Sequence, residues 1–159
     1  MSETEIAIPK AGIPEIAGSC LCGAVRIELT DARPQVEICH CSMCRQWGGG
    51  PFMGVSSAGF SLSGQDHVIS YRSSEWAERA FCRTCGSNLY YRFIPSDHYS
   101  FCSGLFDFGE TVSISKQIFV DEKPAFYDFA QQTPMQTGPE VIAEAVAAGF
   151  TFPDQAEQS

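Results

Sequence analysis

Seven of the eight cysteines in this chain lie in three short clusters, with spacings typical of metal ligands. In chain order the clusters are Cys20 and Cys22, then Cys39, Cys41 and Cys44, then Cys82 and Cys85. CxC and CxxC spacings place two thiolates on one turn, where both can bind the same ion. Because Zn²⁺ takes about four ligands in a tetrahedron, two pairs make a closed site, whereas a group of three leaves one position open.

The two cysteine pairs are expected to form one closed site. Each pair precedes a glycine, in SCLCG and FCRTCGS, and glycine can adopt the positive φ that turns backbone N–H groups toward sulfur. The pairs lie 60 positions apart, far enough for two β-turns to meet across a sheet. A structural Cys₄ zinc is the simplest interpretation, contributing on the order of 10 kcal/mol to folding. Reduced core cysteines and an iron–sulfur cluster are the alternatives.

The middle cluster, CHCSMC, is compact enough for its three cysteines to bind one ion without a distant ligand. His40 is the obvious candidate for a fourth ligand, but in extended backbone a residue between two ligands points to the opposite face. Three protein ligands leave a position for water or substrate, as in catalytic zinc sites, and thiolate-rich zinc favours an incoming thiol. The alternative is a single zinc with ligands from both the pairs and the middle cluster, but it would leave some of the clustered cysteines without a metal.

The composition indicates one globular domain that is acidic overall. The 159 residues are 44% hydrophobic, enough for one core. The net charge of −9 repels phosphate backbones and anionic membranes, so nucleic acid and membrane surfaces are excluded as partners. An anionic substrate must therefore meet locally placed Arg or Lys. Nothing in the sequence sets the oligomeric state.

The sequence also predicts a cytoplasmic protein. Its N-terminus is acidic and polar without a following apolar run, so it is no secretory signal, and no apolar stretch is long enough to span a bilayer. In a reducing compartment, clustered cysteines indicate metal or redox chemistry more often than disulfides.

The elements that must position the cysteines are predicted to be short strands separated by turns. Residues 1–17 are interpreted as a flexible lead-in, residues 18–152 as a single domain that begins near Gly18, and residues 153–159 as a disordered tail. Alternating or β-branched runs predict strands at 24–30, 36–39, 52–56, 60–63, 68–71, 79–82, 89–94, 99–103 and 112–120.

One helix is predicted, near the C-terminus. Pro139 suits a first turn, residues 140–148 are rich in Ala and Val, and Gly149 closes the segment. The segment from Cys39 to Pro51 is expected to be a turn, because its glycine run is unsuited to a helix interior. The predicted fold is mainly β, with short antiparallel strands and a small C-terminal helix.

A few further residues are candidates for the site or its surroundings. Four arginines are considered as partners for substrate carboxylates, and they are Arg45, Arg72, Arg83 and Arg92. Arg45 is preferred for binding because it directly follows a predicted ligand. Asp107 is interpreted as a turn cap rather than an acid or base, and Cys102 as a core residue. Trp47 is interpreted either as part of a mobile rim over the open zinc position or as an aromatic anchor for its loop.

The ordered motifs GSCLCGAVRIEL, CHCSMCRQWGG and FCRTCGSNLYY, followed by GLFDF and IFVDEKPAFYDF, resemble the glutathione-dependent formaldehyde-activating enzyme family, the GFA-type domain also found in centromere protein V. The resemblance spans about residues 18 to 130. It departs from many members at two positions, Gln117 in place of His and Phe126 in place of Trp.

The resemblance implies a β-tent fold with two zinc ions. A structural ion would be held by Cys20, Cys22, Cys82 and Cys85, and a catalytic ion by Cys39, Cys41 and Cys44. It further implies a carbon–sulfur lyase that joins a small thiol such as glutathione to a small aldehyde such as formaldehyde, giving S-hydroxymethylglutathione. The alternative is a non-catalytic thiol-binding or zinc-stabilised interaction module.

Overall fold

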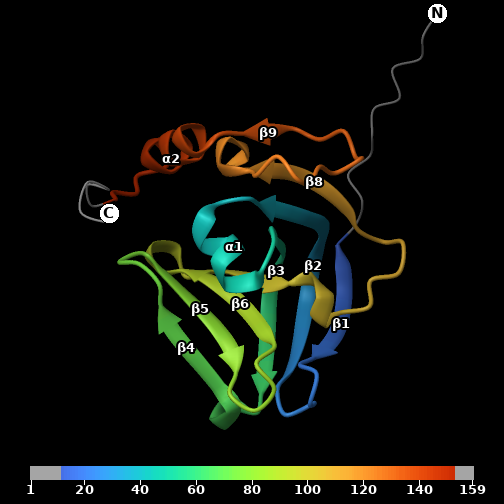
Figure 1. Cartoon of the computed structure of the whole chain (residues 1–159). Coiled ribbons are helices and arrows are strands. Elements are labelled where there is room, and N and C mark those ends of the chain that lie inside the picture. Colours follow the sequence, from blue (N-terminus) through green and yellow to red (C-terminus); the bar gives the residue numbers. More distant parts are fainter. Residues whose placement is uncertain (1–11, 153–159) are drawn as a thin grey trace, which may run out of the picture.

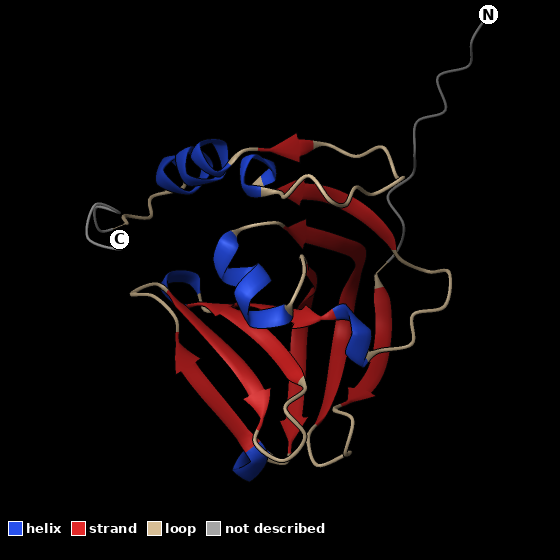
Figure 2. Ribbon diagram, viewed as in Figure 1, coloured by secondary structure: helices blue, strands red, loops and turns tan. Residues whose placement is uncertain are grey.

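The structure is a computed structural model, and it describes residues 12–152; the predicted tail and residues 1–11 of the predicted lead-in lie outside the described residues. Within that range nine strands form a single sheet accompanied by two α-helices (Figures 1 and 2). The strands are β1 Ile13–Ser19, β2 Arg26–Cys39, β3 Phe52–Ser63, β4 Val68–Arg72, β5 Ala77–Cys82, β6 Asn88–Phe93, β7 His98–Cys102, β8 Ser113–Ile118 and β9 Met135–Gln136. The α-helices are α1 Ser42–Gly48 and α2 Gly138–Ala147, and short 3₁₀ turns occupy Gln65–His67, Ile94–Ser96, Ser103–Leu105 and Val120–Glu122.

The order of strands across the sheet is β4-β5-β6-β7-β3-β2-β8-β9. All pairs are antiparallel except β2 with β8 and β8 with β9, which are parallel. The same edge of β2 is shared, because its first half pairs with β1 and its last residues pair with β8. The strands β8 and β9 with α2 therefore form a tier beside the last residues of β2, while α1 lies between that tier and the rest of the sheet (Figure 1).

The long strand β2 carries cysteines at both of its ends. Cys20 and Cys22 lie in the turn before it, and Cys39 is its last residue. The sequence predicts two strands here, but Asp31, with φ 56°, and a register shift between Ala32 and Val36 let one bulged strand continue through. The two strands predicted at 52–56 and 60–63 are likewise one, β3.

Ordered structure begins earlier than predicted, because β1 starts at Ile13 rather than near Gly18. Pro14 is compatible with this strand, since β1 pairs only with β2 and an edge strand does not need every N–H. Gly18 is required for packing rather than for a chain break. A Cβ at this position would lie 2.2 Å from the Leu105 carbonyl oxygen.

The prediction that the segment from Cys39 to Pro51 contains no helix is wrong, because α1 occupies Ser42–Gly48. The Cys41 sulfur caps its first turn by accepting a hydrogen bond from the Cys44 N–H at 3.4 Å. Gly49, with φ 80°, ends the helix and donates to the Arg45 carbonyl. The glycine run therefore terminates a two-turn helix instead of preventing it.

The predicted C-terminal helix is present as α2. Thr137 and Glu140 form a capping box at its start, and Gly149, with φ 100°, follows its end. No helix within residues 12–152 is both long and apolar enough to cross a membrane.

The hydrophobic core lies on the inner face of the curved sheet. Its fully buried side chains come mainly from β2, β3, β6 and β7, and they include Ile27, Leu29, Val55, Leu89 and Phe101. The sulfur-bearing residues Cys20 and Cys82 belong to the same buried cluster, so the sheet positions one cysteine group directly.

Candidate metal centres and the adjoining cavity

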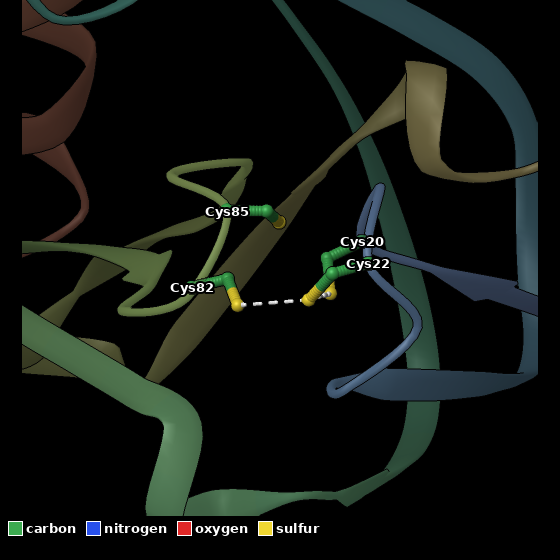
Figure 3. A group of neighbouring side chains, drawn as sticks. All are labelled: Cys20, Cys22, Cys82 and Cys85. Atoms are coloured by element: carbon green, nitrogen blue, oxygen red, sulfur yellow. Dashed lines mark hydrogen bonds between the residues drawn. The ribbon is translucent and has the colours of Figure 1, made fainter.

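Four cysteine sulfurs gather where two turns meet. Cys20 and Cys22 come from the β1–β2 turn, whereas Cys82 ends β5 and Cys85 lies in the β5–β6 turn (Figure 3). The sulfurs all lie within 4.8 Å of one another, with 3.6 Å between Cys20 and Cys22 and 3.8 Å between Cys22 and Cys82. Tetrahedral zinc with its usual bond lengths places thiolate sulfurs about 3.8 Å apart. This four-cysteine cluster therefore fits a tetrahedral thiolate-bound metal.

Hydrogen bonds around the four-cysteine cluster fix its two turns to each other. The Val25 N–H donates to the Cys20 sulfur at 3.3 Å. The Ser87 hydroxyl lies 3.2 Å from the Cys85 sulfur and accepts from the Leu21 N–H at 3.0 Å, so this one side chain joins both turns. Hydrogen bonding by Ser87 lowers the pKa of Cys85 to about 5, which favours the thiolate. The sequence reasoning did not single out Ser87.

The other three sulfurs gather at the start of α1. Cys39 ends β2, Cys41 is the N-cap of α1 and Cys44 lies in its first turn, and their sulfurs also lie within 4.8 Å of one another. Hydrogen bonding from the Cys39 and Cys44 thiols lowers the pKa of Cys41 to about 2, and the same contact raises the pKa of Cys39. Three crowded thiols oppose one another's ionisation, and a divalent cation would let all three ionise.

A cavity of about 450 Å³ opens on this three-cysteine cluster. All three cysteines line it, together with aromatic side chains that include Phe52, Trp76 and Phe93. The tier above contributes residues of α2 and the following Phe152, which packs against the rings of Trp76 and Phe93. No cysteine of the four-cysteine cluster lines the cavity. Only the three-cysteine cluster is therefore placed to meet a ligand there.

The cavity contains a buried arginine that the sequence reasoning did not nominate. Arg79 of β5 is 5% exposed, and its Nη2 donates to the Cys44 sulfur at 3.4 Å. Its guanidinium lies over the rings of Trp47 and Tyr91, 5.6 Å and 5.1 Å from their centroids. A signal was available, because the strand period of two places Arg79 on the same face as the apolar Ala77.

His40 points away from the sulfurs into a buried polar network. Its Nε2 lies 2.8 Å from the Gln117 Oε1, and its Nδ1 lies 2.7 Å from the Tyr127 hydroxyl. Because Gln117 Nε2 donates to Thr133, the Gln117 oxygen accepts from the Nε2–H of His40, and Tyr127 donates to Nδ1. Burial lowers the pKa of His40. Both ring nitrogens therefore have hydrogen-bond partners, and these bonds hold in place the turn that carries Cys39 and Cys41.

The four arginines nominated from sequence lie outside the cavity wall. Arg45 Nε donates to the His40 carbonyl at 3.0 Å, so it braces the same turn, and its contact with a ligand stays a prediction. Arg92 pairs with Glu78 and Asp97, while Arg72 and Arg83 donate to backbone carbonyls.

The other residues singled out from the sequence lie outside the two cysteine clusters, and their contacts are as follows. The Asp107 Oδ1 accepts from the Gly109 N–H at 3.1 Å, the turn cap that was expected. Trp47 packs against Phe52 and Arg79, which favours the anchor over the rim. Burial raises the pKa of Cys102 to about 12. Phe126 is 84% exposed and contacts the Tyr127 ring.

Comparison with known proteins gives consistent matches. The family model for the glutathione-dependent formaldehyde-activating enzyme matches residues 15–122. A Schizosaccharomyces pombe protein named as an uncharacterized lyase is 38% identical over 136 residues, covering 84% of this chain and 99% of that protein. A Halomonas elongata protein, provisionally named a glutathione-dependent formaldehyde-activating enzyme, is 32% identical over 85 residues, covering 47% of this chain and 54% of that protein.

One solved structure also resembles this chain. A crystal structure of a Rhodobacter sphaeroides protein has a TM-score of 0.50 and 25% sequence identity, and the match covers 59% of this chain and 90% of that one. The match supports the fold described above over the part of the chain that it covers.

Proposed function

Because the chain belongs to the glutathione-dependent formaldehyde-activating enzyme family, we propose that it is a zinc-dependent carbon–sulfur lyase acting on a glutathione-type thiol and a small aldehyde such as formaldehyde. The observation that carries this proposal is the cavity that opens on Cys39, Cys41 and Cys44. It would give a small thiol access to a metal ion held by these three cysteines.

Two zinc ions per chain are part of the proposal. Cys20, Cys22, Cys82 and Cys85 would hold a structural ion, and Cys39, Cys41 and Cys44 would hold the one at the cavity. The sulfur separations support both assignments. When bound, zinc at the three-cysteine cluster supplies Lewis acidity and favours the ionised form of an added thiol.

The reaction adds a thiol across a carbonyl: a carbon–sulfur bond forms, and the sulfur's proton ends on the carbonyl oxygen. Aromatic side chains in the cavity wall would leave less water around the thiol and the aldehyde, which favours their reaction with each other. The Arg79 guanidinium beside the Cys44 sulfur offsets the negative charge of the thiolates. The His40 network holds the turn that carries Cys39 and Cys41.

The test is exchange NMR with the zinc-loaded full chain, ¹³C-formaldehyde and glutathione. We expect exchange between free formaldehyde and S-hydroxymethylglutathione to be faster than in buffer. Cys102→Ser is the matched control, because it removes a cysteine outside both clusters and should keep the acceleration. Glutathione binding without acceleration would instead support a thiol-binding module. If glutathione neither binds nor speeds the exchange, the proposed function is overturned.

A further inference from the structure

We propose that Arg79 and Ser74 form a carboxylate-binding site in the cavity, so that the preferred thiols are those that carry a carboxylate. This inference rests on the proposed function of the three-cysteine cluster, and it adds the substrate class and the residues that select it. It begins from two buried polar atoms that lack partners and belong to residues that line the same cavity.

The first of these atoms is Nε of Arg79. The Nη1 of this guanidinium donates to the Ser73 hydroxyl and the Nη2 donates to the Cys44 sulfur, but Nε has no acceptor. Within residues 12–152, no carboxylate forms an ion pair with Arg79. A buried charged donor without an acceptor is costly, so its presence beside a cavity indicates an acceptor that arrives with the ligand.

The second atom is the hydroxyl oxygen of Ser74, which is also buried and unpartnered. Ser74 and Arg79 both line the cavity. A carboxylate has two acceptor oxygens, so a single group can accept from the guanidinium and from the hydroxyl together. A neutral ligand would satisfy neither donor as well.

The guanidinium is held in place before any ligand binds. The rings of Trp47 and Tyr91 both contact it, and the bonds to Ser73 and Cys44 fix its orientation. A fixed cation binds an anion without an ordering cost, and burial strengthens the attraction. This matters in a chain of net charge −9, whose overall field repels anions.

The two carboxylates that line the cavity already have other partners. Glu37 lies 3.7 Å from the Lys116 ammonium, and Glu122 accepts from the Ser42 N–H at 3.3 Å. Charge balance for the cysteine thiolates explains the contact of Arg79 with Cys44. It leaves the open Nε and the Ser74 hydroxyl unexplained, and a ligand carboxylate accounts for both.

The experiment is isothermal titration calorimetry of the zinc-loaded full chain with 3-mercaptopropionate and its neutral analogue 3-mercaptopropan-1-ol. We expect the carboxylate to bind on the order of tenfold to a hundredfold more tightly, as for a hydrogen-bonded charge. Equal affinities would overturn the carboxylate site and leave the proposed function standing. If neither thiol binds, the carboxylate site is overturned, and the exchange experiment with glutathione decides the proposed function separately.

Three variants test whether Arg79 and Ser74 cause the preference for the carboxylate thiol. Arg79→Gln should abolish it, whereas Arg26→Gln, which removes an exposed arginine on β2, should retain it in full. Ser74→Ala removes a hydroxyl that has no partner, so the fold should be unchanged while the preference falls severalfold. A preference that survives both Arg79→Gln and Ser74→Ala would overturn the assignment, and Ser74→Ala alone decides it if Arg79→Gln does not fold.

Discussion

The two cysteine clusters of this protein share their ligand chemistry but differ in how the chain brings them together. The four-cysteine cluster joins two turns, with Cys22 and Cys82 separated by 60 residues. The three-cysteine cluster spans six residues, from the end of β2 to the first turn of α1. A metal that ties distant turns stabilises the sheet, whereas one held by a local segment beside a cavity is available to a ligand. Sequence span, more than ligand type, would separate the two proposed roles.

Breaking the four-cysteine cluster should have the largest effect. Cys82→Ser is expected to unfold the protein, because structural zinc contributes on the order of 10 kcal/mol and whole domains are stable by about 5–15 kcal/mol. Circular dichroism and a count of bound zinc would measure this. Cys102→Ser is the control. If the Cys82→Ser chain melts at the same temperature as the Cys102→Ser chain, the four-cysteine cluster has no structural role.

Breaking the three-cysteine cluster should cost activity but not the fold. Cys41→Ser is expected to reduce bound zinc from two per chain to one and to lower the formaldehyde–thiol exchange rate at least a hundredfold, since the remaining donors bind a metal poorly. The melting temperature should stay within a few degrees of the parent. Equal unfolding of the Cys41→Ser and Cys82→Ser chains would erase the distinction between the clusters.

The network behind the three-cysteine cluster should give a smaller effect. Gln117→Leu leaves the Nε2–H of His40 buried without an acceptor, which costs roughly 1–3 kcal/mol. Thermal melts should shift by about 2–4 °C per kcal/mol at this chain length. Gln35→Leu makes the same substitution at an exposed position of β2 and serves as the control. Identical melts for the two variants would show that the network is not stabilising.

The cysteine outside both clusters should give the smallest effect. Burial raises the pKa of Cys102 to about 12 from an ordinary value of 9.0, so its thiol stays protonated in the folded chain when the unfolded chain loses that proton. Its contribution to stability therefore falls as pH rises above about 9. At pH 8.5, iodoacetamide should alkylate Cys102 much more slowly in the zinc-loaded folded chain than in the chain unfolded by denaturant, as mass spectrometry can follow. Equal labelling rates in the folded and unfolded chains would contradict the raised pKa of Cys102.

The sequence predicted the grouping of the cysteines because ligand spacing is local chemistry. The C-terminal helix was equally readable, since Pro139 and Gly149 mark its ends. The predicted mainly β fold is confirmed by the sheet. The metal ligands themselves, and their division into structural and catalytic sites, stay predictions.

Other features depended on contacts between distant residues, which local patterns do not encode. The strand β1 was missed because Pro14 resembles a chain break until its edge position is known. The helix α1 was missed because the glycine run, which ends the helix, was expected to prevent it, and because its cap is a cysteine sulfur rather than a usual capping oxygen. Arg79 acquires its meaning only from Trp47, Tyr91 and Cys44, which come from other elements.

The meeting of the β1–β2 and β5–β6 turns also sets an order of events during folding. Neighbouring strands such as β1 with β2 and β5 with β6 can pair as local hairpins, which form quickly. In the sheet, the two hairpins are linked only through β3, which joins β2 to β7, so we expect the two turns to meet after these pairings form. Long-range closure is slow compared with hairpin formation. Metal uptake by all four of these cysteines would therefore be a late kinetic step, and its rate in refolding would time the completion of the native sheet.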